Sequence, residues 1–143
     1  MIILDTNVLS ALMRAVPDAP VVAWLDRQPP ESVWITSITL FESRLGLSLL
    51  PTGRRRQALE AAFAELLEDD LEHRVLPFDN VAAAQAAELA AARQRQGRPV
   101  DLRDTMIAGI ALARRATLAT HNLRHFEGLA VPVIDPWHEE NRP

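Results

Sequence analysis

Four polar residues stand where they could form a site for metal-assisted chemistry: Asp5, Glu42, Asp104 and Asn122. Three separate segments each supply an acid, and a fourth supplies an amide. Three carboxylates gathered within ~4 to 6 Å would repel one another by several kcal/mol, so such a cluster either takes up protons or holds a cation. Hard oxygen ligands of this kind favour Mg²⁺ or Mn²⁺. The pattern therefore predicts a divalent-metal site if the fold brings these residues together.

Asp5 directly follows the apolar run 2–4, which is typical of a buried strand. Apolar residues recur after it at helical spacing, so we expect the chain to turn directly from strand to helix. An aspartate at this position is equally well explained as the N-cap of that helix. Thr6 and Asn7 could add a hydroxyl and an amide at the same edge, and we give them a supporting role only.

Glu42 shares one helical stripe with Ile38, Leu45 and Leu49. A carboxylate on an apolar stripe is costly to desolvate unless a positive group meets it. The stripe therefore predicts an acid that faces the core and serves a site. The alternatives are an ion pair with a buried arginine, or a place at the wet margin of the stripe.

Asp104 repeats this pattern, because Ile107, Ala108 and Ala111 follow it at i+3, i+4 and i+7. Its place in the first turn of the expected helix also lets the helix dipole stabilise its charge. Asp101 stands three residues earlier and is better explained as the N-cap. We therefore rank Asp104 above Asp101 as a ligand, although both could reach a common pocket.

Strand and helix signals alternate along the chain and predict its architecture. Strands are expected at residues 2–4, 33–36, 73–78, 117–120 and 131–134. Helices are expected after residue 5 and at residues 18–28, 39–50, 52–71, 79–97 and 101–115. Strands that are apolar on both faces predict an α/β domain of three layers, with a mostly parallel five-stranded sheet flanked by helices. We expect residues 1–143 to form one such domain. Active sites of these sheets lie beyond the carboxyl ends of the strands, where Asp5 and Asn122 stand.

Composition excludes several classes of chemistry. The 143 residues include 19 acidic and 15 cationic side chains, every cation is arginine, and lysine, cysteine and tyrosine are absent. Schiff-base lysines, P-loop lysine contacts, disulfides and thiolate nucleophiles are therefore excluded. The net charge of -4 argues against tight binding of many phosphates but leaves a turnover nuclease open. Because no targeting signal or apolar span of ~18 residues is present, we expect a cytoplasmic protein that makes no membrane contact.

The order and spacing of these motifs resemble those of PIN-domain ribonucleases, most closely the VapC-type toxins of bacterial toxin-antitoxin pairs. The resemblance spans nearly the whole chain. It rests on Asp5-Thr6-Asn7 after an apolar strand, on residues 38–42 ending in Glu42, on residues 104–108, on Thr120-His121-Asn122, and on the stretch from residue 118 to Pro136-Trp137.

The resemblance implies a metal-dependent endoribonuclease that acts as the toxin of such a pair. It implies that Asp5 and Asp104 bind Mg²⁺ or Mn²⁺ and that Glu42 completes the acidic pocket and orients or deprotonates water. It also implies an RNA substrate, a homodimer, and a cognate antitoxin through which operator DNA is bound indirectly. Many PIN domains have an acid where this chain has Asn122, so a second metal site is in doubt.

Two other functions compete with this prediction. An aspartyl-phosphate phosphatase would use Asp5 as nucleophile, but such sites resemble Asp-x-Asp with a distant lysine, and here the third residue is Asn7 and lysine is absent. A catalytically impaired PIN-like domain would act as a binding or regulatory module, and Asn122 would be a symptom of that loss. Retention of Asp5, Glu42 and Asp104 argues against this second alternative.

Several charged residues near the motifs receive no role from the sequence. Because lysine is absent, arginine is the side chain that could contact phosphates through a positive charge. Arg98, Arg103 and Arg124 flank the motifs. Each is equally explained as a solvated surface charge. Residues 54–56, three consecutive arginines, oppose the dipole of the helix they begin and could contact RNA or an acidic partner, or simply be solvated. His121 neighbours Asn122, yet the histidine spacing predicts no metal site.

Overall fold

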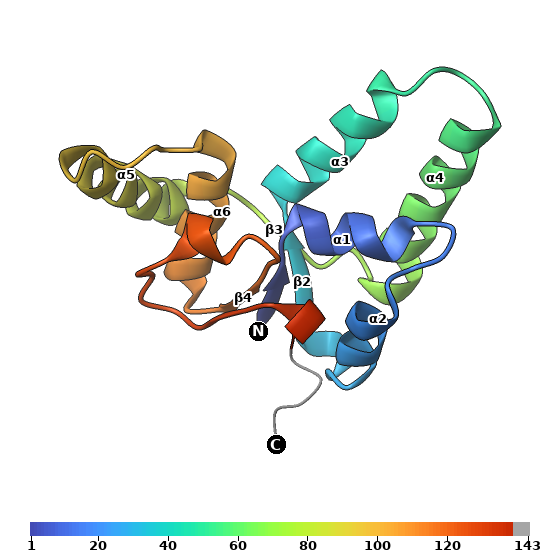
Figure 1. Cartoon of the computed structure of the whole chain (residues 1–143), viewed down its shortest axis with the longest axis horizontal. Helices are drawn as coiled ribbons and strands as arrows, with labels where there is room; N and C mark the ends of the chain where they lie inside the picture. Colours follow the sequence, from blue (N-terminus) through green and yellow to red (C-terminus); the bar gives the residue numbers. More distant parts are fainter. Residues whose placement is uncertain (139–143) are drawn as a thin grey trace.

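The computed structural model describes residues 1–138, and its five strands form one sheet (Figure 1). The strands lie in the order β3-β2-β1-β4-β5, and each neighbouring pair is parallel. Their bounds are β1 Ile2–Leu4, β2 Val33–Thr36, β3 Val75–Leu76, β4 Thr117–Ala119 and β5 Val133–Ile134. The predicted parallel five-stranded sheet is therefore confirmed.

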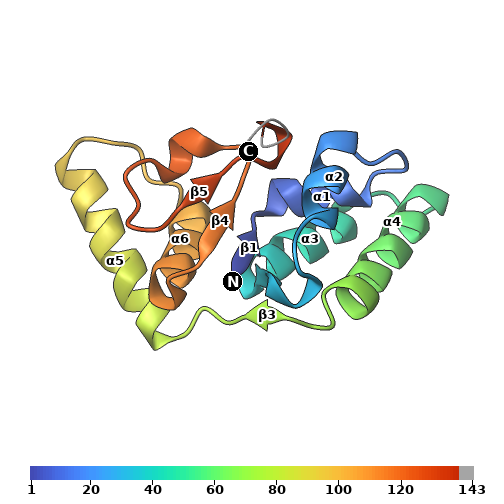
Figure 2. The same ribbon diagram turned by 90° about the horizontal axis from the view of Figure 1, so that it is seen from below.

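Helices cover both faces of the sheet, with α1 to α4 on one side and α5 and α6 on the other (Figure 2). The helices are α1 Thr6–Met13, α2 Ala19–Asp26, α3 Ser37–Leu49, α4 Arg54–Glu65, α5 Asn80–Arg95 and α6 Leu102–Arg114. Short helical turns occupy η1 Pro30–Ser32, η2 Leu66–Asp70, η3 Leu123–Phe126 and η4 Pro136–His138. This confirms the three-layer α/β prediction. Within residues 1–138, none of the helices has the length and apolar character that a membrane span requires.

The central strand β1 joins two hydrophobic cores, because successive residues of a strand point to opposite faces. Ile3 packs with the buried residues of α5 and α6, whereas Leu4 packs with those of α1, α2 and α4. Both side chains are almost completely buried. Packing on both faces therefore fixes β1, and with it the position of Asp5, the next residue.

Two predicted segments have different boundaries in the structure. The strand expected at 73–78 is reduced to Val75–Leu76, because Glu72 and His73 just before it adopt positive φ angles, which interrupt an extended chain. The helix expected at 52–71 ends as an α-helix at Glu65 and continues as the wider turn η2, in which the amide of Leu71 donates to the carbonyl of Leu66.

The last strand and the third helix also differ from expectation. β5 comprises only Val133–Ile134 rather than residues 131–134. α3 begins at Ser37 rather than residue 39, because the Thr36 hydroxyl caps the helix by accepting a 3.1 Å hydrogen bond from the amide of Thr39. The helix therefore starts directly at the carboxyl end of β2, as α1 does at the end of β1.

α5 and α6 pack closely because α6 contains Gly109 at their contact. A Cβ atom at this position would lie 2.6 Å from the carbonyl oxygen of Ala82 and 2.8 Å from the Cβ of Ala86. The backbones of α5 and α6 can therefore come this close only because residue 109 is glycine. α6 carries Asp104, so this close packing holds a site residue in place.

We expect Gly109→Ala to destabilise the protein by about 1 to 3 kcal/mol, because the added methyl overpacks the contact with α5. Gly46→Ala is the matched control, since nothing lies within 4 Å of the Cβ it would add in α3. That change should leave stability unchanged or raise it by up to about 1 kcal/mol through helix propensity. Urea unfolding followed by circular dichroism measures both, and equal effects would contradict the packing account.

Candidate active site

The carboxyl edge of the sheet brings together residues that are far apart in sequence. Asp5 follows β1, Thr120 follows β4, and Thr36 ends β2, so all three lie at the edge to which parallel strands point. α3 and α6 add Glu42 and Asp104 to the same region, as the electrostatic effect of both acids on Asp5 indicates. Three of the four predicted site residues are therefore neighbours.

Asp5 is buried, with only 3% of its surface exposed, and its carboxylate accepts three hydrogen bonds. Oδ1 accepts from the amide of Thr6 at 2.8 Å, and Oδ2 accepts from the hydroxyl of Thr120 at 2.6 Å and from the side-chain amide of Asn7 at 3.2 Å. Asp5 is also the N-cap residue of α1. The capping and site interpretations thus hold together, since one carboxylate does both.

Burial raises the pKa of Asp5 from its ordinary 3.8 to about 6, because the ionised form loses its hydration. The hydrogen bonds from Thr120 and Thr6 lower this pKa, whereas the negative charges of Asp104 and Glu42 raise it. Desolvation is the largest cause. A cation near Asp5 would stabilise its ionised form and lower its pKa again.

Glu42 reaches the site through hydroxyl groups. Its Oε1 accepts a 2.8 Å hydrogen bond from the hydroxyl of Thr6, and that hydroxyl lies 3.1 Å from the hydroxyl of Thr39. Its Oε2 lies 3.6 Å from Arg103, whose side chain is half exposed, so this ion pair contributes little to stability. Glu42 therefore keeps most of its negative charge available to the site.

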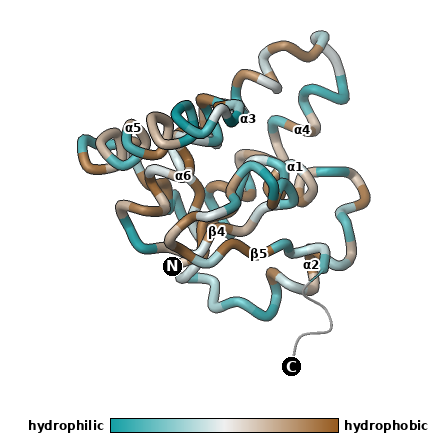
Figure 3. Tube along the Cα trace, turned by 60° about the vertical axis from the view of Figure 1, so that its left-hand side comes forward, coloured by the Kyte–Doolittle hydropathy of each residue, from teal (hydrophilic) through white to brown (hydrophobic). Residues whose placement is uncertain are grey.

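The predicted core-facing stripe of α3 holds at Ile38, which packs against a hydrophobic core, but fails at its far end. Leu49 is 75% exposed, and the buried residues of α3 are Thr39 and Leu47. The reason is that α3 and α4 form a hairpin that projects from the sheet, so the far end of α3 has no layer above it (Figure 1). Figure 3 shows that hydrophobic and hydrophilic residues both occur along α3. Glu42 lies at the solvent-exposed margin of the stripe, which is one of the alternatives that the sequence left open.

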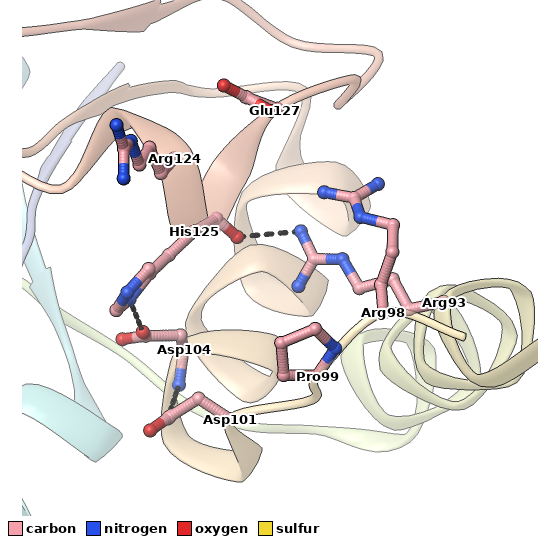
Figure 4. Close-up of a pocket in the computed structure, with 8 residues that line it drawn as sticks. All are labelled: Arg93, Arg98, Pro99, Asp101, Asp104, Arg124, His125 and Glu127. Carbon is pink, nitrogen blue, oxygen red and sulfur yellow. Dashed lines mark hydrogen bonds and ion pairs between the residues drawn. The ribbon is translucent and has the colours of Figure 1, made fainter. Parts of the chain in front are cut away.

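Asp104 stands in the first turn of α6 and contacts His125, whose Nδ1 lies 2.5 Å from its Oδ2 (Figure 4). The Asp104 side chain is 17% exposed, whereas Ile107 and Ala108 below it are completely buried. The Asp101 carboxylate accepts from the amide of Asp104 at 2.9 Å and caps the helix, as predicted. Asp104 thus lies at the end of an apolar stripe on α6, and its carboxylate lies at the carboxyl edge of the sheet against His125.

The structure does not bring the Asn122 side chain to the acids. Asn122 is exposed and has no side-chain hydrogen bond with any residue in the range 1–138. Its backbone amide donates to the Thr120 hydroxyl at 3.0 Å. The hydroxyl and amide that do contact Asp5 come from Thr120 and Asn7, so Asn7 has the supporting role suggested for it.

Sequence reasoning missed Thr120 and His125. Thr120 directly follows β4, and the position rule that selected Asp5 after β1 applies to it equally. His125 carries no such signal, because it lies in the short turn η3, 21 residues from Asp104. His121 lies at the same edge: its amide donates to Asn7 at 3.2 Å, and its ring lies 3.3 Å from the buried carboxylate of Asp135.

The donor set suits a hard divalent cation. Asp5 is desolvated, and the negative charges of two further carboxylates, Asp104 and Glu42, raise its pKa. Carboxylate oxygens are the ligands that Mg²⁺ and Mn²⁺ prefer. In residues 1–138, no three His, Asp or Glu side chains are placed so that they could jointly hold a metal ion. Mg²⁺ commonly binds one or two carboxylates and completes its coordination shell with water. Two of the acids at this edge can provide those carboxylates.

We expect Asp5→Asn to stabilise the metal-free protein above pH 6. A carboxyl with a raised pKa binds its proton more tightly in the folded chain, so its ionisation costs stability. This cost is absent below about pH 4, grows between about pH 4 and pH 6, and reaches on the order of 1–3 kcal/mol above that range. Asparagine keeps the shape and cannot ionise.

Urea unfolding from pH 4 to pH 8 in chelator measures this gain for Asp5→Asn. Glu88→Gln removes an exposed charge elsewhere and should show no such pH dependence. A gain for Asp5→Asn that is the same at pH 4 and pH 8 would show that Asp5 does not titrate in this window.

Comparison with known proteins places this chain in a family. The model of the PIN domain family matches residues 2–131. The VapC ribonuclease Y4jK of Sinorhizobium fredii is 38% identical and covers 96% of this chain and 98% of its own. Toxin FitB of Neisseria gonorrhoeae is 36% identical, with coverage of 97% and 100%. A solved structure of FitAB bound to an IR36 DNA fragment covers 100% of both chains at 36% identity, with a TM-score of 0.88. This chain belongs to the PIN domain family.

Proposed function

We propose that this protein is a metal-dependent endoribonuclease that hydrolyses phosphodiester bonds of RNA and acts as the toxin of a toxin-antitoxin pair. The observation that carries the proposal is the buried Asp5 carboxylate, whose pKa is raised by burial and further by Asp104 and Glu42. Relatives named as a VapC ribonuclease and as a toxin support it.

In this proposal Asp5 and Asp104 hold Mg²⁺ or Mn²⁺, and Glu42 completes the acidic pocket. When bound, the cation supplies Lewis-acid stabilisation of the charge that builds on the phosphate and makes water a better nucleophile near neutral pH. Thr120 and Thr6 hold the Asp5 carboxylate in one orientation by their hydrogen bonds. Such fixed ligands need little rearrangement during the reaction.

Glu42 is the residue that would orient the attacking water and accept its proton. The oxygen of that water forms a bond to phosphorus while the bond from phosphorus to the leaving oxygen breaks, and the leaving oxygen takes up a proton from solvent. The Thr6 hydroxyl fixes one oxygen of Glu42 and Arg103 lies beside the other, so the carboxylate is oriented without being neutralised by a buried partner. Position is the first requirement of a general base, which must lie within hydrogen-bond reach of the proton it accepts.

Asn122 separates this proposal from its alternative, a catalytically impaired PIN-like module. We list Asn122 with the site because an amide can orient water or substrate. Its side chain is exposed and makes no hydrogen bond to the acids within residues 1–138. Asp5, Glu42 and Asp104 therefore do not depend on it for their arrangement, which supports an active enzyme that lacks a fourth acid.

The proposed partners follow from the relatives. We propose that a cognate antitoxin binds and silences the protein, that operator DNA is contacted only through the antitoxin, and that the toxin is a homodimer. The FitAB structure is bound to a DNA fragment, which supports DNA contact by a complex of this kind. We also propose that residues 1–143 act as a single nuclease domain in the cytoplasm.

We expect the purified protein, freed of any partner, to cleave bulk RNA with Mg²⁺ or Mn²⁺ and to lose this activity in chelator. Glu42→Gln should lower the cleavage rate about 100-fold, because a general base contributes that much or more. Asp5→Asn and Asp104→Asn should lower it at least as far, since they remove the ligands. Gel analysis of time courses measures the rates.

Asp26→Asn and Glu88→Gln are the controls, because they remove exposed acids outside the site. Both should cleave at the wild-type rate. If Asp5→Asn and Asp104→Asn preparations cleaved as fast as wild type, the site assignment would be wrong and a contaminating nuclease would explain the activity. Metal-independent cleavage by the wild type would exclude the proposed cofactor.

Induced expression of the wild-type chain in a bacterium should arrest growth, because uncontrolled RNA cleavage stops protein synthesis. Asp5→Asn should remove the arrest, and coexpression of the small protein encoded next to this gene should relieve it. Growth curves and viable counts measure the effect. Harmless expression of active wild-type enzyme would contradict the toxin role while leaving the nuclease activity in place.

A further inference from the structure

A cavity of about 370 Å³ opens beside Asp104 and contains three arginines (Figure 4). Arg93 comes from the end of α5, Arg98 from the loop between α5 and α6, and Arg124 from η3. Three separate segments therefore contribute arginines to the lining, and in Figure 4 the guanidinium groups of Arg93 and Arg98 lie on one side of His125 and that of Arg124 on the other. We call this space, with Arg93, Arg98 and Arg124, the arginine pocket.

Arg93 forms the inner wall of the arginine pocket and is only 4% exposed. One of its terminal nitrogens, Nη2, donates to the carbonyl oxygen of His125 at 2.7 Å, whereas its buried Nε has no partner among residues 1–138. Burial lowers the pKa of Arg93, and the nearby charge of Arg98 lowers it further. A buried cation with a second cation beside it is stabilised by an anion bound near both.

Three acids, Asp101, Asp104 and Glu127, also line the arginine pocket, and the charge of Asp104 raises the pKa of Arg93. In residues 1–138, Arg93, Arg98 and Arg124 form no ion pair within 4.0 Å. Asp104 contacts His125, and Asp101 uses its carboxylate to cap α6. The three guanidinium groups therefore have no carboxylate partner within ion-pair distance among residues 1–138, which leaves their outer nitrogens available to an anion.

We propose that the arginine pocket binds a backbone phosphate of the RNA, next to the phosphate that is cleaved. This inference rests on the proposed function, because the cleaved phosphate must lie at Asp104, which also lines the pocket. A guanidinium binds the non-bridging oxygens of a phosphate in a two-pronged geometry, and this chain has no lysine to do so. Arg93 is the fixed element, and Arg98 and Arg124 complete the site from the rim.

Continuity with the proposed active site favours RNA over an acidic segment of a protein partner. A strand whose scissile phosphate lies at Asp104 carries further phosphates on either side, so one of them meets the pocket without an additional binding event. The pocket would then position the substrate rather than take part in bond cleavage. It would set which end of the strand runs toward α5.

RNA binding in chelator tests the pocket without any cleavage. The probe is a fluorescein-labelled single-stranded RNA of mixed sequence, followed by anisotropy. Arg98→Gln and Arg124→Gln should each weaken binding about tenfold, as expected for a lost charge-assisted contact. Each should also reduce the slope of log K against log salt by about 0.7, the value for one phosphate contact on a single strand. These residues serve better than Arg93, whose replacement could unfold the chain.

Arg95→Gln is the matched control, because it removes an exposed arginine from the same helix end outside the pocket. It should bind as wild type does. If all three variants weakened RNA binding equally, only general charge would matter and the pocket would be excluded. If Arg98→Gln and Arg124→Gln bound RNA normally but lost the protein partner, the pocket would be a protein contact and the proposal would be overturned.

Neutral phosphates identify which group is bound. In an RNA that the wild type cleaves, each phosphate flanking the cleavage site is replaced in turn by an uncharged methylphosphonate. One replacement should lower kcat/KM of the wild type about tenfold but leave that of Arg98→Gln unchanged, because the contact is already lost. Equal losses in both proteins at every position would overturn the proposal. A tenfold preference for a 5′-phosphorylated over a 5′-hydroxyl RNA, lost in Arg98→Gln, would assign the pocket to a terminal phosphate instead.

The outcomes distinguish this inference from the proposed nuclease function. If the wild type cleaves RNA and the pocket variants bind and cleave normally, the pocket proposal fails and the function stands. If the wild type binds RNA with the predicted loss in both variants but never cleaves, the nuclease proposal fails and phosphate binding is supported. Absence of RNA binding by the wild type in chelator would overturn the pocket proposal alone, because cleavage in the presence of metal tests the nuclease function separately.

Discussion

The burial of one carboxylate at the end of β1 is the constraint on which the site depends. Ile3 and Leu4 fix that strand between two hydrophobic cores, so Asp5 has no freedom to move toward water. Thr120 and Thr6 donate to its oxygens, yet burial outweighs these bonds and raises the pKa of Asp5 to about 6. A proton or a nearby cation stabilises such a group in the folded protein, and the surrounding oxygens suit a divalent metal.

Basic side chains are arranged around this acidic centre rather than within it. Arg103 lies at the outer oxygen of Glu42, His125 contacts Asp104, and the arginine pocket opens beyond His125. In an RNA strand the reacting phosphate is stabilised by a metal ion, whereas the neighbouring anionic phosphates are bound by guanidinium groups. The net charge of -4 conceals this division, because the acids that matter are concentrated at one edge of the sheet.

Local signals in the sequence predicted the parts of the site that depend on local structure. Asp5 at a strand end and Asp101 as a helix cap follow from a few adjacent residues, and both were predicted. The Thr120 and His125 contacts join residues 115 and 21 positions apart, and only the packed sheet and η3 bring them together. The stripe of Glu42 misled because periodicity shows which residues share a helix face but not whether a neighbouring layer covers it. The burial of Arg93 was hidden for the same reason.

The pKa of Asp5 tests the central claim most directly. Carboxyl carbon chemical shifts measured by NMR across pH 4 to 8 report it, first in chelator and then with Mg²⁺. The account predicts titration near pH 6 in chelator and a fall in this pKa when Mg²⁺ is added, with no such fall in Asp104→Asn. An Asp5 that titrates near its ordinary 3.8 without metal, or whose pKa is unaffected by Mg²⁺, would contradict the account.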